Sequence, residues 1–131
     1  MSDLLMNEYQ KLAMRTDSFN YDESNPQSLR LLNGLMGLNG EAGEAIDIYK
    51  KAMFQGHDID IEEIIEELGD VLWYIALSAD AISVSLDEIA RLNIAKLRKR
   101  YPEGFSTEDS IERRDHDPNG EPDMPKVRDE S

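Results

Sequence analysis

The sequence predicts an all-α protein, an antiparallel helical bundle of three or four helices that is completed by oligomerisation. Apolar residues recur at helical spacing in four successive segments. Capping boxes, the side-chain patterns that start helices, precede two of these segments. The connections between the later segments are short, as in antiparallel bundles. Because one short helix and two or three longer ones make a thin bundle, we expect a homodimer or homotetramer to complete the core.

The first helix is expected within residues 3–16. Its apolar face would consist of Leu5, Met6, Tyr9, Leu12 and Ala13. Turn-forming residues then dominate from position 16 to position 27 and end the helical pattern.

The second helix is expected from about Leu29 to Phe54, with Gly56 as its stop signal. Its apolar stripe comprises Leu31, Leu35, Leu38, Ala42, Ile46, Tyr49 and Met53. Glycine recurs at every third position from 34 to 43, and each glycine costs about 1 kcal/mol relative to alanine inside a helix. Either the helix is irregular in its first half, or another segment approaches its backbone closely. We favour the irregular helix.

The third helix is expected to begin after the capping box of Asp60 and Glu63 and to run to about Ile82. The residues expected on its buried stripe are Ile61, Ile64, Ile65, Leu68, Leu72, Ile75, Ala79 and Ile82. The fourth helix follows a second box, Ser85 and Glu88, and reaches Arg100, with Pro102 ending it.

Composition divides the chain into two parts. Residues 1–101 are expected to form one catalytic helical domain. Residues 102–131 form an acidic, proline-containing tail with ten acidic and four basic side chains. Such a segment buries too little apolar surface to order itself, so the tail is expected to be extended or disordered.

The net charge restricts the classes of partner. The chain carries 28 acidic and 14 basic side chains, a formal charge of −14. That field repels nucleic acid polymers and anionic membranes and attracts cations, so neither a polymer nor a membrane is expected as a partner. The sequence has no cysteine and no apolar run of membrane-spanning length. We expect a soluble protein of the bacterial cytoplasm, or a bacteriophage protein in the cytoplasm of its host.

Two pairs of carboxylates carry the chemical signal. Glu41 and Glu44 lie three residues apart on the second helix, and Glu67 and Asp70 lie three residues apart on the third. Residues at this spacing share a helix face, so an antiparallel pairing would bring all four together. Facing carboxylates need a counterion, and their hard oxygens suit Mg²⁺ or Mn²⁺. The other interpretation is a solvated acidic face, and spacing alone does not decide between the two.

The pattern E-x-x-E, 22 intervening residues and E-x-x-D resembles the signature of the MazG-like all-α nucleoside triphosphate pyrophosphohydrolases of bacteria and phages. The segments GLNGEAGEAIDIYKK and IEELGDVLWYIALSAD look like that family's two metal-binding helices. The segment NIAKLRKRYPEGFS looks like the helix and turn that follow them. The resemblance implies metal-dependent hydrolysis of a (deoxy)nucleoside triphosphate to the monophosphate and pyrophosphate.

The resemblance also implies roles for individual residues. Glu41, Glu44, Glu67 and Asp70 would hold two or three Mg²⁺ ions per site, with Mn²⁺ as an alternative. Glu44 and Asp70 would also be catalytic, and Glu63 would be a further ligand or take the proton of the attacking water. The residues expected to contact phosphates are Lys96, Arg100, Asn93 and, on helical geometry, Lys51. Without the resemblance, Lys96 and Arg100 would read as a solvated helix end.

Several alternatives stay open at this point. The base is not specified, and a purine deoxynucleotide such as dGTP is a working hypothesis. Trp73 invites interpretation as a base-stacking platform, although a lone aromatic residue at helical spacing is more often packing. The chain could instead be dUTPase-like or phosphoribosyl-ATP pyrophosphatase-like. Outside this class it could be a non-enzymatic acidic helical binding protein, or a regulatory nucleotide binder with slow turnover.

Overall fold

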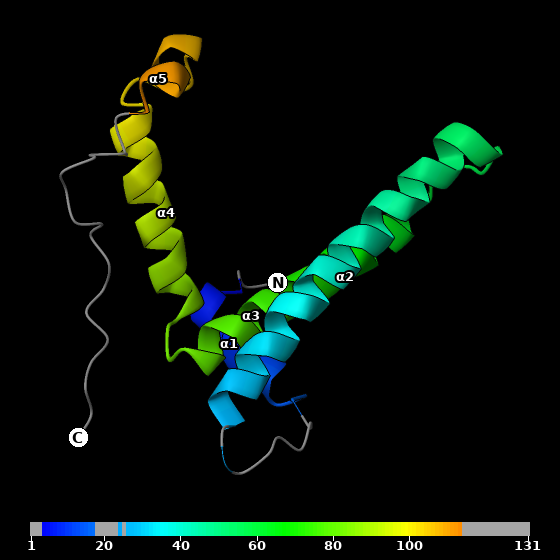
Figure 1. Ribbon diagram of the computed structural model, residues 1–131, viewed down its shortest axis with the longest axis horizontal. Coiled ribbons are helices and arrows are strands. Elements are labelled where there is room, and N and C mark those ends of the chain that lie inside the picture. The colour runs from blue at the N-terminus through cyan, green and yellow to red at the C-terminus, as the bar shows by residue number, and fades with distance from the viewer. Residues whose placement is uncertain (1–3, 18–23, 25, 114–131) are drawn as a thin grey trace. The chain divides into compact units, whose positions relative to one another are not determined.

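The computed structural model describes residues 4–17, 24 and 26–113. They form five α-helices: α1 (Met6–Met14), α2 (Pro26–Gln55), α3 (Ile61–Ala81), α4 (Leu86–Arg100) and α5 (Thr107–Glu112) (Figure 1). No strand occurs in these ranges, and the β-type pairing within them is an isolated bridge between residues 102 and 104. The all-α prediction is therefore confirmed. The chain divides into two compact units, residues 1–89 and 90–131, which are described separately.

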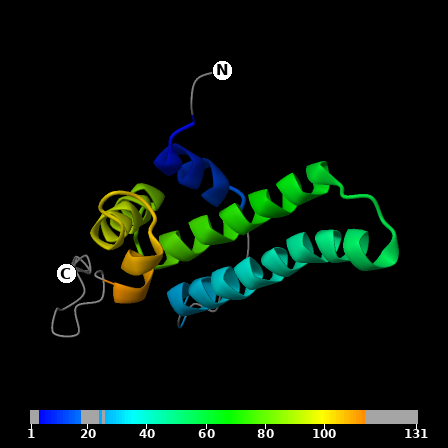
Figure 2. The same ribbon diagram turned by 90° about the horizontal axis from the view of Figure 1, so that it is seen from above.

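In the first unit α2 and α3 form a long antiparallel hairpin, and α3 lies between α2 and α1 (Figure 2). The core lies where α1 meets the second half of α3. Its central cluster consists of Ala13, Ala76, Ala79 and Leu86, all buried, and Leu77 and Ala81 are buried as well. Tyr9, Met14, Trp73 and Ile75 pack around this cluster. The core is small for a chain of this length, because α1 covers only one end of the hairpin.

Glycine residues allow α2 and α3 to approach closely. A Cβ atom at Gly34 would overlap the Oγ atom of Ser78, and one at Gly37 would overlap the ring of Tyr74. Because α2 is one continuous helix from Pro26 to Gln55, the expectation of an irregular first half was wrong. Close approach of α3 explains these two glycines. We call the contact line between α2 and α3 the seam.

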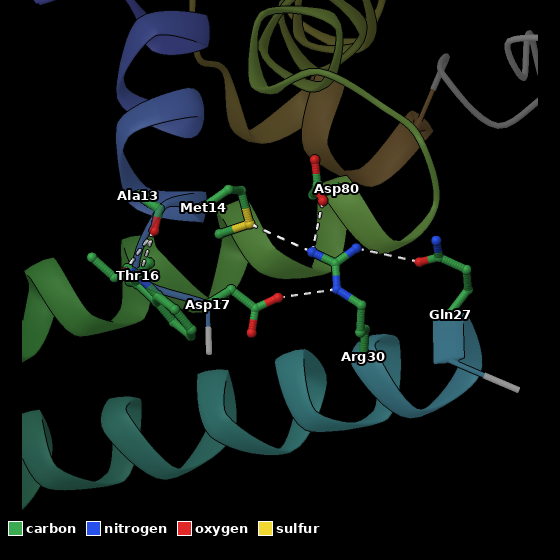
Figure 3. Close-up of polar contacts among 8 residues, drawn as sticks. Ala13, Met14, Thr16, Asp17, Gln27, Arg30 and Asp80 are labelled. Carbon is green, nitrogen blue, oxygen red and sulfur yellow. Dashed lines mark hydrogen bonds and ion pairs between the residues drawn. The ribbon is translucent and has the colours of Figure 1, made fainter. Parts of the chain in front are cut away.

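An arginine cluster ties the base of the hairpin to the end of α1 (Figure 3). Arg30 of α2 lies 3.1 Å from Asp17 and 2.7 Å from Asp80 of α3. Partial burial by itself would lower the pKa of Arg30, but the hydrogen bonds to Asp80 and Asp17 outweigh it and raise that pKa. The side chains of Arg30 and Asp17 are only 15% and 12% exposed. This pair is therefore far better shielded from water than an ordinary surface ion pair.

One side of the hairpin carries exposed apolar side chains. The stripe expected to be buried on α2 is largely exposed within the chain, where Leu35 is 52% and Ile46 62% exposed. The same holds for Ile65 and Leu68 of α3, at 62% and 56%. The prediction of a buried stripe was wrong for these residues, because the seam uses a neighbouring face of each helix. We call this surface the apolar side; its residues are Leu35, Ile46, Met53, Ile61, Ile65 and Leu68.

The apolar and acidic residues of the hairpin lie on opposite sides of it. At 100° per residue, Leu35 and Ile46 are rotated away from the seam in one sense, and Glu44 in the other. On α3, Ile65 is rotated in the same sense as Leu35, and Asp70 in the same sense as Glu44. Because the two helices are antiparallel, equal senses of rotation fall on the same side of the hairpin. One side is therefore apolar and the other acidic.

The second unit contains most of α4, a tight turn and α5. The rings of Tyr101 and Phe105 lie 5.3 Å apart across the turn, tilted by 48°, and Gly104 in this turn has a φ of +91°. Ser106 caps α5 by accepting a hydrogen bond from the backbone of Asp109. The predicted tail is therefore not extended throughout; its residues 114–131 lie outside the described part of the chain.

No single helix in the described part of the chain has the length and apolar content needed to cross a membrane; α3 and α4 meet that test only when taken together as a bent pair.

Candidate metal centre

Three of the four predicted metal ligands converge at the seam. Glu41 of α2 and Glu67 and Asp70 of α3 each offer a carboxylate oxygen, and these oxygens all lie within 4.8 Å of one another. Glu41 lies two turns of α2 after Gly34. The glycines therefore allow the two backbones to approach each other close to the site where the acids meet. The predicted convergence of acids from two helices is thus present in the structure.

The neighbouring carboxylates perturb Glu67 as like charges do. The pKa of Glu67 is raised by desolvation, by the charge of Glu41 and by a hydrogen bond with Glu41. Asp70 and Glu44 add to this effect through their charges. A site that favours the protonated form of a carboxyl group at its centre is a site where a cation would relieve repulsion.

Glu44 and Glu63 lie around this cluster and not within it. Glu44 is exposed and falls outside the group of three, although its charge acts on Glu67. Glu63 is also exposed, one turn before Glu67, and its backbone N–H donates to the capping carboxylate of Asp60. The structure thus separates the predicted ligands into an inner three and an outer Glu44.

The donor set fits a hard divalent cation. Three carboxylate oxygens within 4.8 Å of one another are the hard ligands that Mg²⁺ and Mn²⁺ prefer. No histidine or cysteine belongs to the cluster, so it lacks the softer ligands typical of zinc and copper sites.

Lys51 has a partner that the sequence analysis missed. Its ammonium group lies 2.7 Å from a carboxylate oxygen of Asp47, which also pairs with Lys50. These hydrogen bonds lower the pKa of Asp47 to about 2. The hydrogen bond to Asp47 raises the pKa of Lys51, and the charges of Glu44 and Glu63 add to this rise. Lys51 therefore lies in the field of the outer carboxylates. Asp47 follows Glu44 at the same three-residue interval that separates Glu44 from Glu41, and this spacing could have identified Asp47 as a neighbour of the site.

The other predicted phosphate contacts lie on α4. Asn93, Lys96 and Arg100 are spaced by three and four residues, so they share one face of that helix. They belong to the second unit, and their approach to the carboxylates stays a prediction.

Two aromatic residues lie beside the acidic cluster. Trp73 follows Asp70 by one turn, and its indole N–H donates to the hydroxyl of Thr16 at 2.8 Å and to the carbonyl of Ala13 at 3.3 Å. These contacts agree with the packing interpretation of Trp73. Burial, followed by the charge of Asp70, raises the pKa of Tyr9 on α1. The spacing of residues in the sequence does not predict that Tyr9 lies near Asp70, because the packing of α1 against α3 brings the two residues together.

Comparison with known protein families decides the class of this site. The model of the MazG nucleotide pyrophosphohydrolase domain matches residues 30–105, more than half of the 131 residues. The chain belongs to the MazG nucleotide pyrophosphohydrolase family. The matched range contains the acidic residues of the candidate metal centre and the basic face of α4. This MazG-family membership supports nucleotide pyrophosphohydrolase activity in general.

Curated relatives are consistent with this MazG assignment but say little about substrates. The chain is 37% identical over 73 residues to the Gene 37 protein of Mycobacterium phage L5, covering 53% of this chain and 64% of the relative. It is 45% identical over 40 residues to the uncharacterized protein YvdC of Bacillus subtilis (strain 168), covering 30% and 38%. The chain thus spans less than two thirds of the length of either relative. No solved structure matches the chain.

Proposed function

We propose that this MazG-family chain hydrolyses a (deoxy)nucleoside triphosphate to the monophosphate and pyrophosphate in a Mg²⁺-dependent reaction. The observation that supports it most is the convergence of Glu41, Glu67 and Asp70 from two helices of a family whose activity is nucleotide pyrophosphohydrolysis. Two or three Mg²⁺ ions, or Mn²⁺ in their place, would be held there. The reaction would take place in the cytoplasm of a bacterium or of a phage-infected host, where nucleoside triphosphates are available.

The carboxylates have different roles in this proposal. Glu41, Glu67 and Asp70 hold the cation, and Glu44 joins them when the triphosphate is bound. When bound, Mg²⁺ supplies neutralising charge for the phosphate oxygens and acidifies a coordinated water. Glu63, one turn from Glu67 and within the field of Lys51, accepts the proton of the attacking water.

The basic residues neutralise the departing group. Lys96 and Arg100 carry the charge that pyrophosphate needs as it leaves, with Asn93 as a hydrogen-bond donor on the same face. Lys51 is held by Asp47 in the structure, so it would reach a phosphate only after exchanging that partner. Its contribution is therefore expected to be smaller.

A homodimer or homotetramer forms part of this proposal. Leu35, Ile46, Met53, Ile61, Ile65 and Leu68 leave a row of apolar side chains along the hairpin, opposite its acidic side. Burying such a surface against a second copy removes apolar area from water without covering the carboxylates.

The proposal is tested by a panel of standard and modified nucleoside triphosphates, including dGTP, dUTP and phosphoribosyl-ATP, with Mg²⁺ or Mn²⁺. Products are identified by chromatography. Monophosphate plus pyrophosphate supports the proposal, and the preferred nucleotide separates the purine-directed, dUTPase-like and phosphoribosyl-ATP pyrophosphatase-like forms. Release of orthophosphate contradicts it. Absence of both hydrolysis and a Mg²⁺-induced thermal shift would leave an acidic binding protein, and tight binding with negligible turnover would leave a regulatory nucleotide binder.

A further inference from the structure

Tyr74 of α3 occupies the seam next to the acidic cluster. One edge of its ring, from Cδ1 to Cζ, lies where a side chain at Gly37 would begin, so the two residues face each other across the antiparallel pair. Glu41 lies four residues after Gly37 on α2, and Asp70 lies four residues before Tyr74 on α3. Since four residues make about one helical turn, the ring lies one turn from the carboxylates on both helices.

The direction of the Tyr74 side chain brings its ring toward these carboxylates. Side chains on an α-helix lean toward the N-terminal end of their own helix, and on α3 that is the direction of Asp70. Because Gly37 has no side chain, the ring fills the space between the two backbones at this level of the seam. The ring therefore limits how closely α2 and α3 approach each other just beside the cluster.

Trp73 supports the Tyr74 ring and is itself held at the end of α1. The two rings meet edge to face, with their centroids 5.0 Å apart and their planes at 87°. The indole N–H donates to the hydroxyl of Thr16 at 2.8 Å and to the carbonyl of Ala13 at 3.3 Å, which fixes the orientation of the indole. Contacts on two sides leave a ring few alternative rotamers. The position of the Tyr74 ring is thus determined by Gly37 on one side and by Trp73 on the other.

We propose that Tyr74 is a positioning residue for the cation site, braced by Trp73. Its ring holds the turns that carry Glu41 and Asp70 at one separation, so that their carboxylates are in place before a divalent cation binds. Tyr74 acts through the two helices and provides no ligand. A site that is already in shape binds more tightly than one that must order itself on binding. This inference rests on the proposed function, because that function requires the cation.

Mn²⁺ binding tests the proposal with two matched pairs of variants. Free Mn²⁺ is measured by electron paramagnetic resonance in titrations of the full chain without nucleotide. Gly37→Ala, which places a methyl group against the ring, is expected to raise the Kd about fivefold or more. Gly40→Ala, one turn along α2 with open space around its Cβ, should change the Kd less than about twofold. Tyr74→Leu should raise the Kd about fivefold or more, whereas Tyr74→Phe, which keeps the ring, should change it less than about twofold.

A double variant separates the spacing of the helices from general destabilisation. If the ring transmits the effect of Gly37→Ala, that substitution should raise the Kd less than about twofold in the Tyr74→Leu background. Additive losses of affinity, equal effects of Gly37→Ala and Gly40→Ala, or a loss of affinity in Tyr74→Phe as large as in Tyr74→Leu would overturn the inference. The two glycine variants keep the test usable if Tyr74→Leu fails to fold.

A measurement without metal separates this inference from the proposed function. Amide hydrogen exchange of the metal-free protein should become faster in Gly37→Ala and Tyr74→Leu within the turns that carry Glu41 and Asp70. It should stay unchanged or become slower there in Gly40→Ala. Unchanged exchange in both Gly37→Ala and Tyr74→Leu overturns the inference. If the unsubstituted protein binds no Mn²⁺, the proposed metal-dependent function fails, and the exchange rates then decide separately whether Tyr74 fixes these two turns.

Discussion

Arg30 of α2 and Asp80 of α3 are joined by a hydrogen bond of 2.7 Å between Nη2 and Oδ2, although fifty residues separate them in the chain. The same guanidinium donates from Nε to Asp17 at 3.1 Å, so one cation neutralises two carboxylates at the base of the hairpin (Figure 3). The cluster fastens the segment after α1 to both helices of the hairpin.

Replacing this arginine should destabilise the fold. Arg30→Met keeps much of the side-chain volume but leaves Asp17 and Asp80 close together without their shared cation. We expect the free energy of unfolding to fall by about 1–3 kcal/mol in urea denaturation. Lys50→Met is the matched control, because its ion pair with Asp47 lies on an exposed helix surface and should contribute little to stability. Equal losses of unfolding free energy in the two variants would show that the Arg30 cluster stabilises the fold no more than an exposed ion pair does.

Variants of the acidic residues at the candidate metal centre should separate activity from folding. Asp70→Asn and Glu44→Gln are expected to reduce turnover about a hundredfold or more, because each removes charge needed to hold the cation. Asp70→Asn also relieves repulsion at Glu67, so the metal-free protein should melt no lower than the unsubstituted chain. Glu66→Gln, on the same helix but outside the cluster, serves as the control for turnover. An unfolded Asp70→Asn variant, or one with full activity, would contradict the assignment.

Mg²⁺ binding should weaken as the solution is acidified. The pKa of Glu67 is raised in the folded chain, so the stability linked to this group is fully present below its ordinary value of 4.5 and is lost as pH rises through the raised pKa. At neutral pH the ionised group is therefore unfavourable until a cation neutralises it. The Mg²⁺-induced rise in Tm should be larger at about pH 7.5 than at about pH 5, where protons compete for the same oxygens. Glu67→Gln should remove most of the rise at both values, and an unchanged rise in that variant would exclude Glu67 as a ligand.

The glycines of α2 should fall into two classes. Gly34→Ala and Gly37→Ala place a Cβ against Ser78 and Tyr74, and overpacking of about 1–3 kcal/mol should outweigh the gain in helix propensity. Gly40→Ala and Gly43→Ala meet open space and should stabilise the isolated fold by up to about 1 kcal/mol. Thermal melting of the four variants without metal or nucleotide checks this. Stabilisation by Gly34→Ala would mean that the seam is wider than described.

Charge on the apolar side should dissociate the proposed oligomer. Ile65→Glu is expected to shift the protein to monomer in analytical ultracentrifugation, because a buried unpaired carboxylate is strongly unfavourable. Glu66→Lys, at the adjacent position of α3 but away from the apolar side, should leave the assembly unchanged. A monomeric unsubstituted protein would remove this part of the proposal.

Helix positions were largely predictable, because apolar spacing and local caps determine them. The N-cap Asp60 and the cap from Ser85 were expected and are present. The continuity of α2 was not predicted. The low helix propensity of Gly34 and Gly37 can be read from the sequence, whereas the close approach of Ser78 and Tyr74 of α3, which explains these glycines, cannot. The wrong face of α2 was assigned to the core for a similar reason. An apolar stripe indicates which residues avoid water, but not whether the same chain or a second copy covers them.

The inner acids were predictable as a set, because two i, i+3 pairs on neighbouring helices have few ways to pack. Their ranking was not: Glu41 lies within the cluster and Glu44 outside it, a difference that depends on the rotation of α2 about its own axis. Asp47 and Tyr9 were missed. Asp47 lies outside the two i, i+3 pairs of the motif, and the position of Tyr9 depends on how α1 packs against α3.

The glycines of the seam also bear on which ion the site can select. The distance between the backbones of α2 and α3 sets how far the oxygens of Glu41 and Glu67 must reach, and that reach decides the ionic radius that fits between them. A bulkier residue at position 34 or 37 would spread the helices and favour a larger ion, such as Ca²⁺, over Mg²⁺. The absence of a side chain at Gly34 and Gly37 would thus influence which cation binds, although neither residue belongs to the acidic cluster.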